Sequence, residues 1–130
     1  MPADNKLVII VEDEPDTAEM FAELMRLEGY QIKKAYGGTA AIDLLTKETP
    51  YVVLLDIMMP DVSGLEVLRY MRRDPQLENI PVVVISGRPK PDEIINDLEN
   101  SATVYVMKPI GVEQILSAIA EAVDKSSKPR

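Results

Sequence analysis

The chain has 130 residues, of which 46% are hydrophobic and 28% are charged, a size and composition typical of one globular domain. Its net charge of −8 argues against direct nucleic-acid binding, because phosphate recognition needs a basic face. Without cysteine or histidine the chain has no thiolate and lacks the commonest general base, so any chemistry falls to carboxylates, hydroxyls, lysine and a hard cation.

The first half of the chain predicts two strand–helix pairs. The all-apolar segment Leu7–Val11 is expected to be a buried strand. A helix over Pro15–Glu28 follows, since proline suits a first helical turn and Gly29 is a natural stop. Gln31–Ala35 is expected to form a shorter, half-polar strand, and Thr39–Lys47 an amphipathic helix.

The second half continues the alternation. Val52–Leu55 is a second all-apolar strand, and Val82–Ile85 is a third. Between them, Ser63 and Glu66 have the spacing of a capping box at the start of a helix that runs to about Arg73.

The last third predicts a helix over about Asp92–Glu99, a fifth strand over Val104–Met107 and a final helix over Gly111–Val123. Residues 1–124 are expected to form the domain, and residues 125–130 a polar tail. No apolar run approaches the roughly 20 residues needed to cross a bilayer, and the start of the chain does not look like a targeting signal. We therefore expect a cytoplasmic protein without a membrane partner.

Strand and helix alternate five times, which predicts an α/β fold. Three strands without a polar face call for a parallel sheet covered on both sides. Because crossovers between parallel strands are right-handed, a doubly wound domain is the economical arrangement.

Polar residues end four of these strands, where open parallel sheets form their sites. They are Glu12 and Asp13, then Asp56, then Ser86, and then Lys108. Each alone has an ordinary explanation, such as a helix start, a cap or an exit from a strand. Together, at one rim of the sheet, they indicate a functional site.

The residue types at this rim favour phosphoryl chemistry. Clustered carboxylates without histidine suit Mg2+, which prefers oxygen ligands. Lys108 can pair with a phosphate, and Ser86 can donate a hydrogen bond to a phosphoryl oxygen. Asp56 can act as the nucleophile and become an acyl phosphate.

At these residues the chain resembles the receiver domains of response regulators, the aspartate-phosphorylated half of two-component signalling. The resemblance covers essentially the whole chain. Each motif is weak alone, but the order and spacing of the four are specific. The motifs are VIIVEDE at Val8–Glu14, LLDIMMPDVSG at Leu54–Gly64, IPVVVISG at Ile80–Gly87 and YVMKP at Tyr105–Pro109.

The resemblance implies a flavodoxin-like fold with five helices and five parallel strands in the order 2-1-3-4-5. It also implies that Asp56 is the phosphoacceptor. Glu12, Asp13 and Asp56 would hold Mg2+ together with the backbone carbonyl of Met58, and Lys108 would pair with the phosphate.

Three further roles follow from the resemblance. Ser86 would be the switch hydroxyl, Pro109 the family's cis-proline, and Tyr105 the aromatic that turns inward with Ser86. Tyr105 also has a plainer explanation, as an amphipathic residue on an edge strand. Ile110 stands where the family usually has phenylalanine, and Asn100–Thr103 lacks the residues behind one subfamily's dimer face, so that mode of dimerisation is not expected here.

Two residues are expected to tune the lifetime of the phosphate. Aspartate-nucleophile phosphatases place a second aspartate two positions after the first, whereas this chain has Met58 there. Arg88 lies two residues beyond Ser86. We expect both side chains to shield the phosphoryl group, making autodephosphorylation slow.

The expected function is a phosphorylation-dependent switch rather than a conventional enzyme. The phosphodonor would be a sensor histidine kinase or a histidine phosphotransfer protein, and a change in the surface of helix 4, strand 5 and helix 5 would control a protein partner. The alternatives are a small-molecule phosphatase and a receiver-like module that works without phosphorylation. The chain is either a stand-alone receiver or part of a longer protein.

Overall fold

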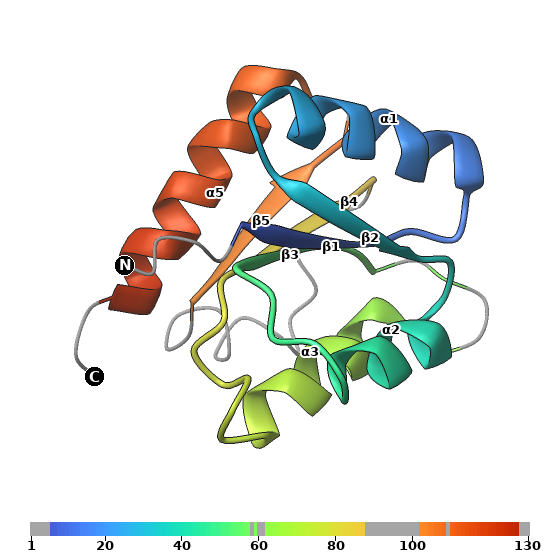
Figure 1. Cartoon of the computed structure of the whole chain (residues 1–130), viewed down its shortest axis with the longest axis vertical. Coiled ribbons are helices and arrows are strands. Elements are labelled where there is room, and N and C mark those ends of the chain that lie inside the picture. Colours follow the sequence, from blue (N-terminus) through green and yellow to red (C-terminus); the bar gives the residue numbers. More distant parts are fainter. Residues whose placement is uncertain (1–5, 58, 60–61, 88–101, 109, 128–130) are drawn as a thin grey trace.

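A computed structural model describes residues 6–57, 59, 62–87, 102–108 and 110–127. Five parallel strands form one sheet in the order β2-β1-β3-β4-β5 (Figure 1). This confirms the expected α/β class, strand number and strand order. The strands are β1 Leu7–Val11, β2 Gln31–Ala35, β3 Val52–Asp56, β4 Val82–Ser86 and β5 Thr103–Met107.

The described residues contain four helices rather than the five expected. The predicted helix over Asp92–Glu99 lies outside them. Ser63 caps α3 as predicted, because its hydroxyl oxygen accepts a hydrogen bond from the backbone N–H of Glu66 at 3.3 Å. The helices are α1 Pro15–Leu27, α2 Gly38–Leu45, α3 Gly64–Arg73 and α5 Val112–Ser127.

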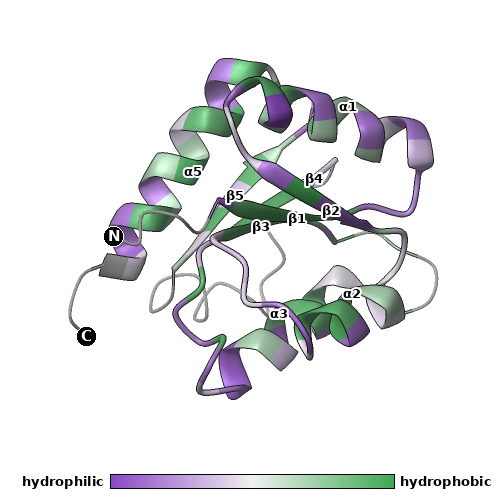
Figure 2. Ribbon diagram, in the orientation of Figure 1, coloured by the Kyte–Doolittle hydropathy of each residue, from purple (hydrophilic) through white to green (hydrophobic). Residues whose placement is uncertain are grey.

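The helices cover both faces of the sheet, with α1 and α5 on one face and α2 and α3 on the other (Figure 1). Alternate residues of the central strands therefore enter two cores. In β1, Val8 and Ile10 pack toward α1 and α5, while Ile9 and Val11 pack toward α2 and α3. Burial on both faces explains why the central strands are apolar up to Asp56 and Ser86, the last residues of β3 and β4 (Figure 2).

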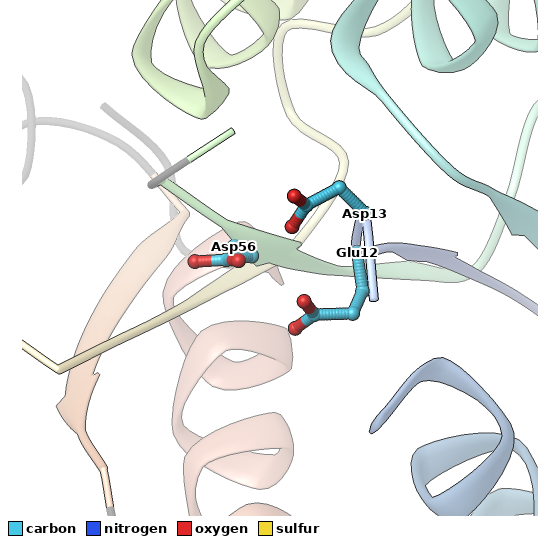
Figure 3. A group of neighbouring side chains, drawn as sticks. All are labelled: Glu12, Asp13 and Asp56. Carbon is cyan, nitrogen blue, oxygen red and sulfur yellow. The ribbon is translucent and has the colours of Figure 1, made fainter. Parts of the chain in front are cut away.

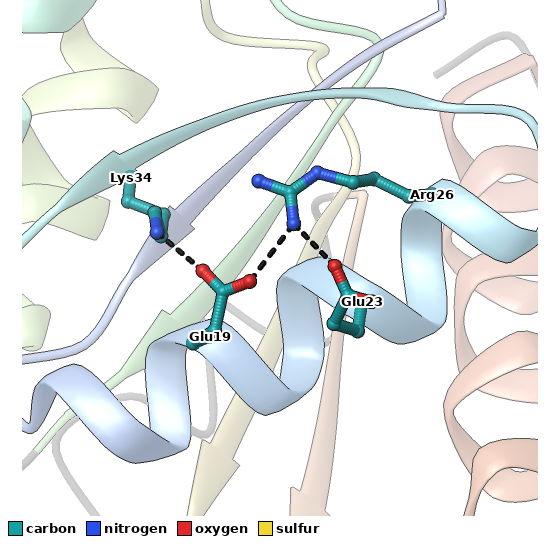
Figure 4. Close-up of polar contacts among 4 residues, drawn as sticks. All are labelled: Glu19, Glu23, Arg26 and Lys34. Carbon is teal, nitrogen blue, oxygen red and sulfur yellow. Dashed lines mark hydrogen bonds and ion pairs between the residues drawn. The ribbon is translucent and has the colours of Figure 1, made fainter.

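The edge strand β2 is half polar, and its two lysines lie on opposite faces: Lys33 is exposed and pairs with Glu48 at 2.6 Å, whereas Lys34 lies on the side of α1. There Lys34 Nζ pairs with Glu19 at 2.5 Å, and Arg26 pairs with Glu19 at 2.9 Å and with Glu23 at 2.6 Å (Figure 4). The two cations hold the pKa of Glu19 below its usual value. These pairs are largely exposed, so they add little stability, but charged lysines also protect an edge strand from pairing with another chain.

The last helix is longer than expected and continues to Ser127, three residues into the predicted polar tail. The Lys125 ammonium donates a hydrogen bond to the Thr103 carbonyl oxygen at 2.9 Å, and the Ser126 hydroxyl donates to the Asn79 carbonyl oxygen. Hydrogen bonds to neighbouring segments therefore hold the last turn of the helix, although the polar composition of residues 125–127 predicted a tail. No helix in the described part of the chain is long and apolar enough to cross a membrane.

Candidate functional site

The strand register brings the predicted site residues to one edge of the sheet. Val11 pairs with Leu55, so Glu12 lies beside Asp56 at the carboxyl ends of β1 and β3. Asp56 pairs in turn with Ile85, and Ser86 pairs with Met107. The polar residues predicted to form the site therefore lie at the carboxyl ends of four adjacent strands, as expected. They are Glu12, Asp13, Asp56, Ser86 and Lys108.

Three carboxyl groups gather at this edge (Figure 3). Glu12, Asp13 and Asp56 each offer one oxygen, and these oxygens lie within 4.8 Å of one another. Glu12 is 4% exposed and Asp56 is 6% exposed, while Asp13 is half-buried. Lys108 is the cation of the site, with its Nζ 3.6 Å from Glu12 Oε1.

Glu12 has a perturbed acidity. Its pKa rises from 4.5 to about 7, first because burial penalises the charged form and second because the Asp56 carboxylate repels a second negative charge. The backbone N–H of Glu14, which donates to Glu12 Oε2 at 3.3 Å, and the Lys108 ammonium act in the opposite direction and lower the pKa. Among the described residues, the carboxyl groups here thus carry more potential negative charge than Lys108 balances.

The raised pKa of Glu12 predicts that the free energy of unfolding depends on pH. In the unfolded chain Glu12 ionises near 4.5, whereas in the folded protein it keeps its proton up to about pH 7. Between these values the folded state binds more protons, so raising the pH lowers the free energy of unfolding, by at most about 3 kcal/mol. We expect Glu12→Gln to match the wild type at pH 5 and to exceed its stability at pH 8.

Urea unfolding at both pH values, in the absence of divalent cations, measures this difference. Glu14→Gln is the matched control, because Glu14 is exposed and should leave the pH dependence unchanged. A Glu12→Gln protein that loses as much stability as the wild type between pH 5 and pH 8 would contradict the prediction.

The donor set fits a hard divalent cation. All three groups supply carboxylate oxygens, and a cation would offset the repulsion that raises the pKa of Glu12. Binding requires ionised Glu12. A metal at this position would therefore compete with the proton on Glu12.

The serine and the lysine lie beside the acidic cluster. Ser86 is fully buried at the end of β4, and its carbonyl oxygen accepts a hydrogen bond from the backbone N–H of Lys108 at 2.7 Å. Tyr105 is half-buried and packs with the core on the α2 and α3 side of the sheet. Ile110 instead packs with the core beneath α1 and α5. Of the other predicted site residues, Met58, Arg88 and Pro109 lie outside the described part of the chain.

Gly64 is a residue whose importance to this site the sequence alone does not reveal. Its sequence context indicates only a turn, yet a Cβ there would lie 2.6 Å from the Ile57 Cα, 2.9 Å from the Asp56 carbonyl carbon and closer still to the Asp56 carbonyl oxygen. The Gly64 N–H also donates to the Ile57 carbonyl oxygen at 3.1 Å. The start of α3 is therefore packed against the backbone of the predicted phosphoacceptor.

Residues 8–120 match the family model of the response regulator receiver domain. The chain therefore belongs to the receiver domain family, which confirms the resemblance seen in the sequence. Members of this family are signalling modules of two-component systems and not conventional enzymes.

Two curated relatives differ in how much of their length this chain spans. The polar-differentiation response regulator DivK of Brucella anthropi is 32% identical over 114 residues, a match that covers 88% of this chain and 93% of DivK. The probable transcriptional regulatory protein TcrX of Mycobacterium tuberculosis is 36% identical over 109 residues. That match covers 84% of this chain, which spans only 46% of TcrX.

Solved structures share the fold. The bacteriophytochrome response regulator AtBRR is 28% identical, with a TM-score of 0.76 over 92% of this chain and 93% of the other. A CheY-like receiver domain protein from Methanospirillum hungatei JF-1 has a TM-score of 0.81 at 22% identity, over 93% and 95% of the two chains.

Proposed function

We propose that this chain is a phosphorylation-dependent signalling switch whose phosphoacceptor is Asp56. The observation that carries the proposal is the position of Asp56, a nearly buried carboxylate at the end of β3, grouped with Glu12 and Asp13 and with Lys108 at the same rim. Two buried carboxylates beside a half-buried third are costly unless a cation balances their charge. The family supplies the class of signalling in which such a site operates.

In the proposed reaction a carboxylate oxygen of Asp56 attacks the phosphorus atom of the donor. The new oxygen–phosphorus bond forms as the bond to the leaving group breaks, and the leaving group takes that electron pair. The donor is the phosphohistidine of a sensor histidine kinase or of a histidine phosphotransfer protein, or a small acyl phosphate. The product is an acyl phosphate on Asp56.

The surrounding side chains would position the phosphoryl group. Glu12, Asp13, Asp56 and the backbone carbonyl of Met58 would hold Mg2+, which supplies positive charge opposite the phosphoryl oxygens when bound. Lys108 is placed to pair with a phosphoryl oxygen, because its ammonium already faces the cluster at Glu12.

The same event would change a surface. Ser86 would donate a hydrogen bond from its hydroxyl group to a phosphoryl oxygen, and Tyr105 would move inward as Ser86 does, with Pro109 in the cis form. The surface that responds would comprise β5, α5 and the predicted helix over Asp92–Glu99, and it would control a protein partner. We further propose that residues 1–124 form the functional domain and that it works in the cytoplasm.

Labelling with a small phosphodonor tests the proposal. Wild-type protein incubated with acetyl phosphate and Mg2+ is expected to gain one acid-stable, hydroxylamine-sensitive phosphoryl group, and the gain should disappear when EDTA removes the metal. An unlabelled wild type would favour a receiver-like module that works without phosphorylation. Repeated turnover of a phosphate ester would favour a phosphatase.

The lifetime of the phosphate is a separate prediction. We expect Met58 and Arg88 to keep water from the phosphoryl group, because one side chain is apolar and the other is bulky. Met58→Asn offers a polar group that can orient water, so loss of phosphate should be about tenfold faster or more. The decay of the labelled protein after removal of the donor measures this rate, with Met59→Leu as an apolar control. Decay no faster in Met58→Asn than in the wild type would exclude shielding by Met58.

A further inference from the structure

The start of α2 is pressed against the segment that follows the phosphoacceptor. Gly38, the first residue of α2, is buried, and a Cβ there would lie 2.6 Å from the Val62 Cβ and 2.7 Å from the Val62 carbonyl carbon. The Val62 carbonyl oxygen would be closer still. Because backbone atoms make this contact, a change of side-chain rotamer at Val62 cannot relieve it.

Val62 belongs to the connection between β3 and α3, which begins directly after Asp56. At its far end Gly64 packs on the Asp56 carbonyl group and donates its N–H to the Ile57 carbonyl oxygen. The start of α3 is thus anchored to the backbone at the end of the acceptor strand. Gly38 supplies a third point of contact, from outside the connection.

Three other glycines, Gly29, Gly87 and Gly111, do not share this feature. A Cβ on Gly87 or Gly29 would have no neighbour within 4 Å, and one on Gly111 would meet only the side chain of Gln114. Gly29 needs to be glycine for a different reason, because its φ of 93° is unfavourable for other residues. Gly38 and Gly64 are therefore set apart by a close approach of backbone to backbone, and both approaches involve the connection after Asp56.

We propose that Gly38 is a positioning residue for the acceptor site. By letting the backbone of α2 touch Val62, it determines where Val62 and the start of α3 lie beside Asp56, and hence the geometry in which Asp56 meets the cation and the phosphodonor. A side chain at position 38 pushes Val62 away from α2, and Ser63 links Val62 to Gly64, which packs on the Asp56 carbonyl group. The inference rests on the proposed function of Asp56.

The variant Gly38→Ala tests this role. We expect it to raise the Mg2+ concentration for half-maximal labelling by acetyl phosphate about tenfold, because a misplacement costing about 1.4 kcal/mol changes an equilibrium by that factor. Gly29→Ala is the matched control. It strains the turn after α1 at the opposite end of the sheet, so it should lower the melting temperature while leaving half-maximal Mg2+ within about twofold of the wild type.

Two further measurements distinguish a failure of this inference from a failure of the proposed function and from misfolding of the variant. Mg2+ binding followed by the amide chemical shifts of Glu12 and Ile57 needs no phosphorylation, so it tests Gly38 even if the wild type is not labelled. Val62→Ala keeps the carbonyl and Cβ atoms that a side chain at position 38 would meet, so it is a control at the same half-buried position and should leave Mg2+ binding within about twofold of the wild type. Wild-type Mg2+ affinity and labelling rate in folded Gly38→Ala, or a loss of Mg2+ affinity in Val62→Ala as large as that in Gly38→Ala, would overturn the inference.

Discussion

Asp56→Ala is expected to abolish labelling by acetyl phosphate in the presence of Mg2+. The proposed acyl phosphate forms on a carboxylate oxygen that alanine lacks, and no neighbouring carboxylate can replace it. Glu12 and Asp13 are close, but both follow β1, the neighbouring strand, so neither carboxylate takes the position of Asp56. Phosphate incorporation measured by intact-protein mass spectrometry reports the result directly.

The variant should remain folded, which makes the loss of labelling informative. Asp56 contributes to raising the pKa of Glu12, so removing its carboxylate relieves a repulsion in the folded state. We therefore expect a melting temperature no lower than that of the wild type at pH 8. Asp43→Ala is the control, because Asp43 is an exposed carboxylate paired with Lys47 at 3.6 Å. Labelling of folded Asp56→Ala at the wild-type rate would rule out Asp56 as the acceptor.

Of the substitutions proposed for this chain, Arg72→Met is expected to lower the free energy of unfolding the most. The guanidinium Nη1 donates to the carbonyl oxygens of Glu78 and Ile80, both at 2.9 Å, and Nη2 donates to the Ala102 carbonyl oxygen at 3.1 Å and to Thr103 Oγ1 at 2.7 Å. One side chain thus joins α3, the connection before β4 and the start of β5. Methionine can fill the volume but leaves these acceptors without their donor, which should cost about 3 kcal/mol.

The neighbouring arginine provides the control. Arg73 is exposed at the end of α3, so Arg73→Met should change the free energy of unfolding by no more than about 0.5 kcal/mol. Arg72→Lys should recover only a small part of the loss, because one ammonium cannot reproduce the guanidinium fork. Urea unfolding at constant pH measures all three variants. A loss below about 1 kcal/mol in Arg72→Met would show that solvent replaces these hydrogen bonds.

The labelling of Arg72→Met should stay close to that of the wild type under conditions in which the variant is folded. Arg72 contacts the amino end of β5 at Thr103, whereas Lys108 follows the carboxyl end of the same strand. This separation distinguishes a residue that holds the fold together from one that shapes the site.

The strands could be predicted closely from the sequence because their pattern is local. Leu7–Val11 and Gln31–Ala35 have their predicted bounds, while β3, β4 and β5 each differ by a single added residue. An unbroken apolar run of this length is stable only when both faces are covered, so the run itself implies a parallel sheet. Helix ends were less predictable, as α5 shows, because they depend on acceptors contributed by other segments.

The sequence by itself therefore determined the class of fold, the order in which polar residues end the strands, and the family to which the chain belongs. Those properties depend on residue type and spacing along the chain. The tertiary structure alone decided the raised pKa of Glu12, the reach of Arg72 to Thr103 and the contact of Gly38 with Val62. Each of these depends on distances between segments remote in sequence, because burial, repulsion and close packing act through space.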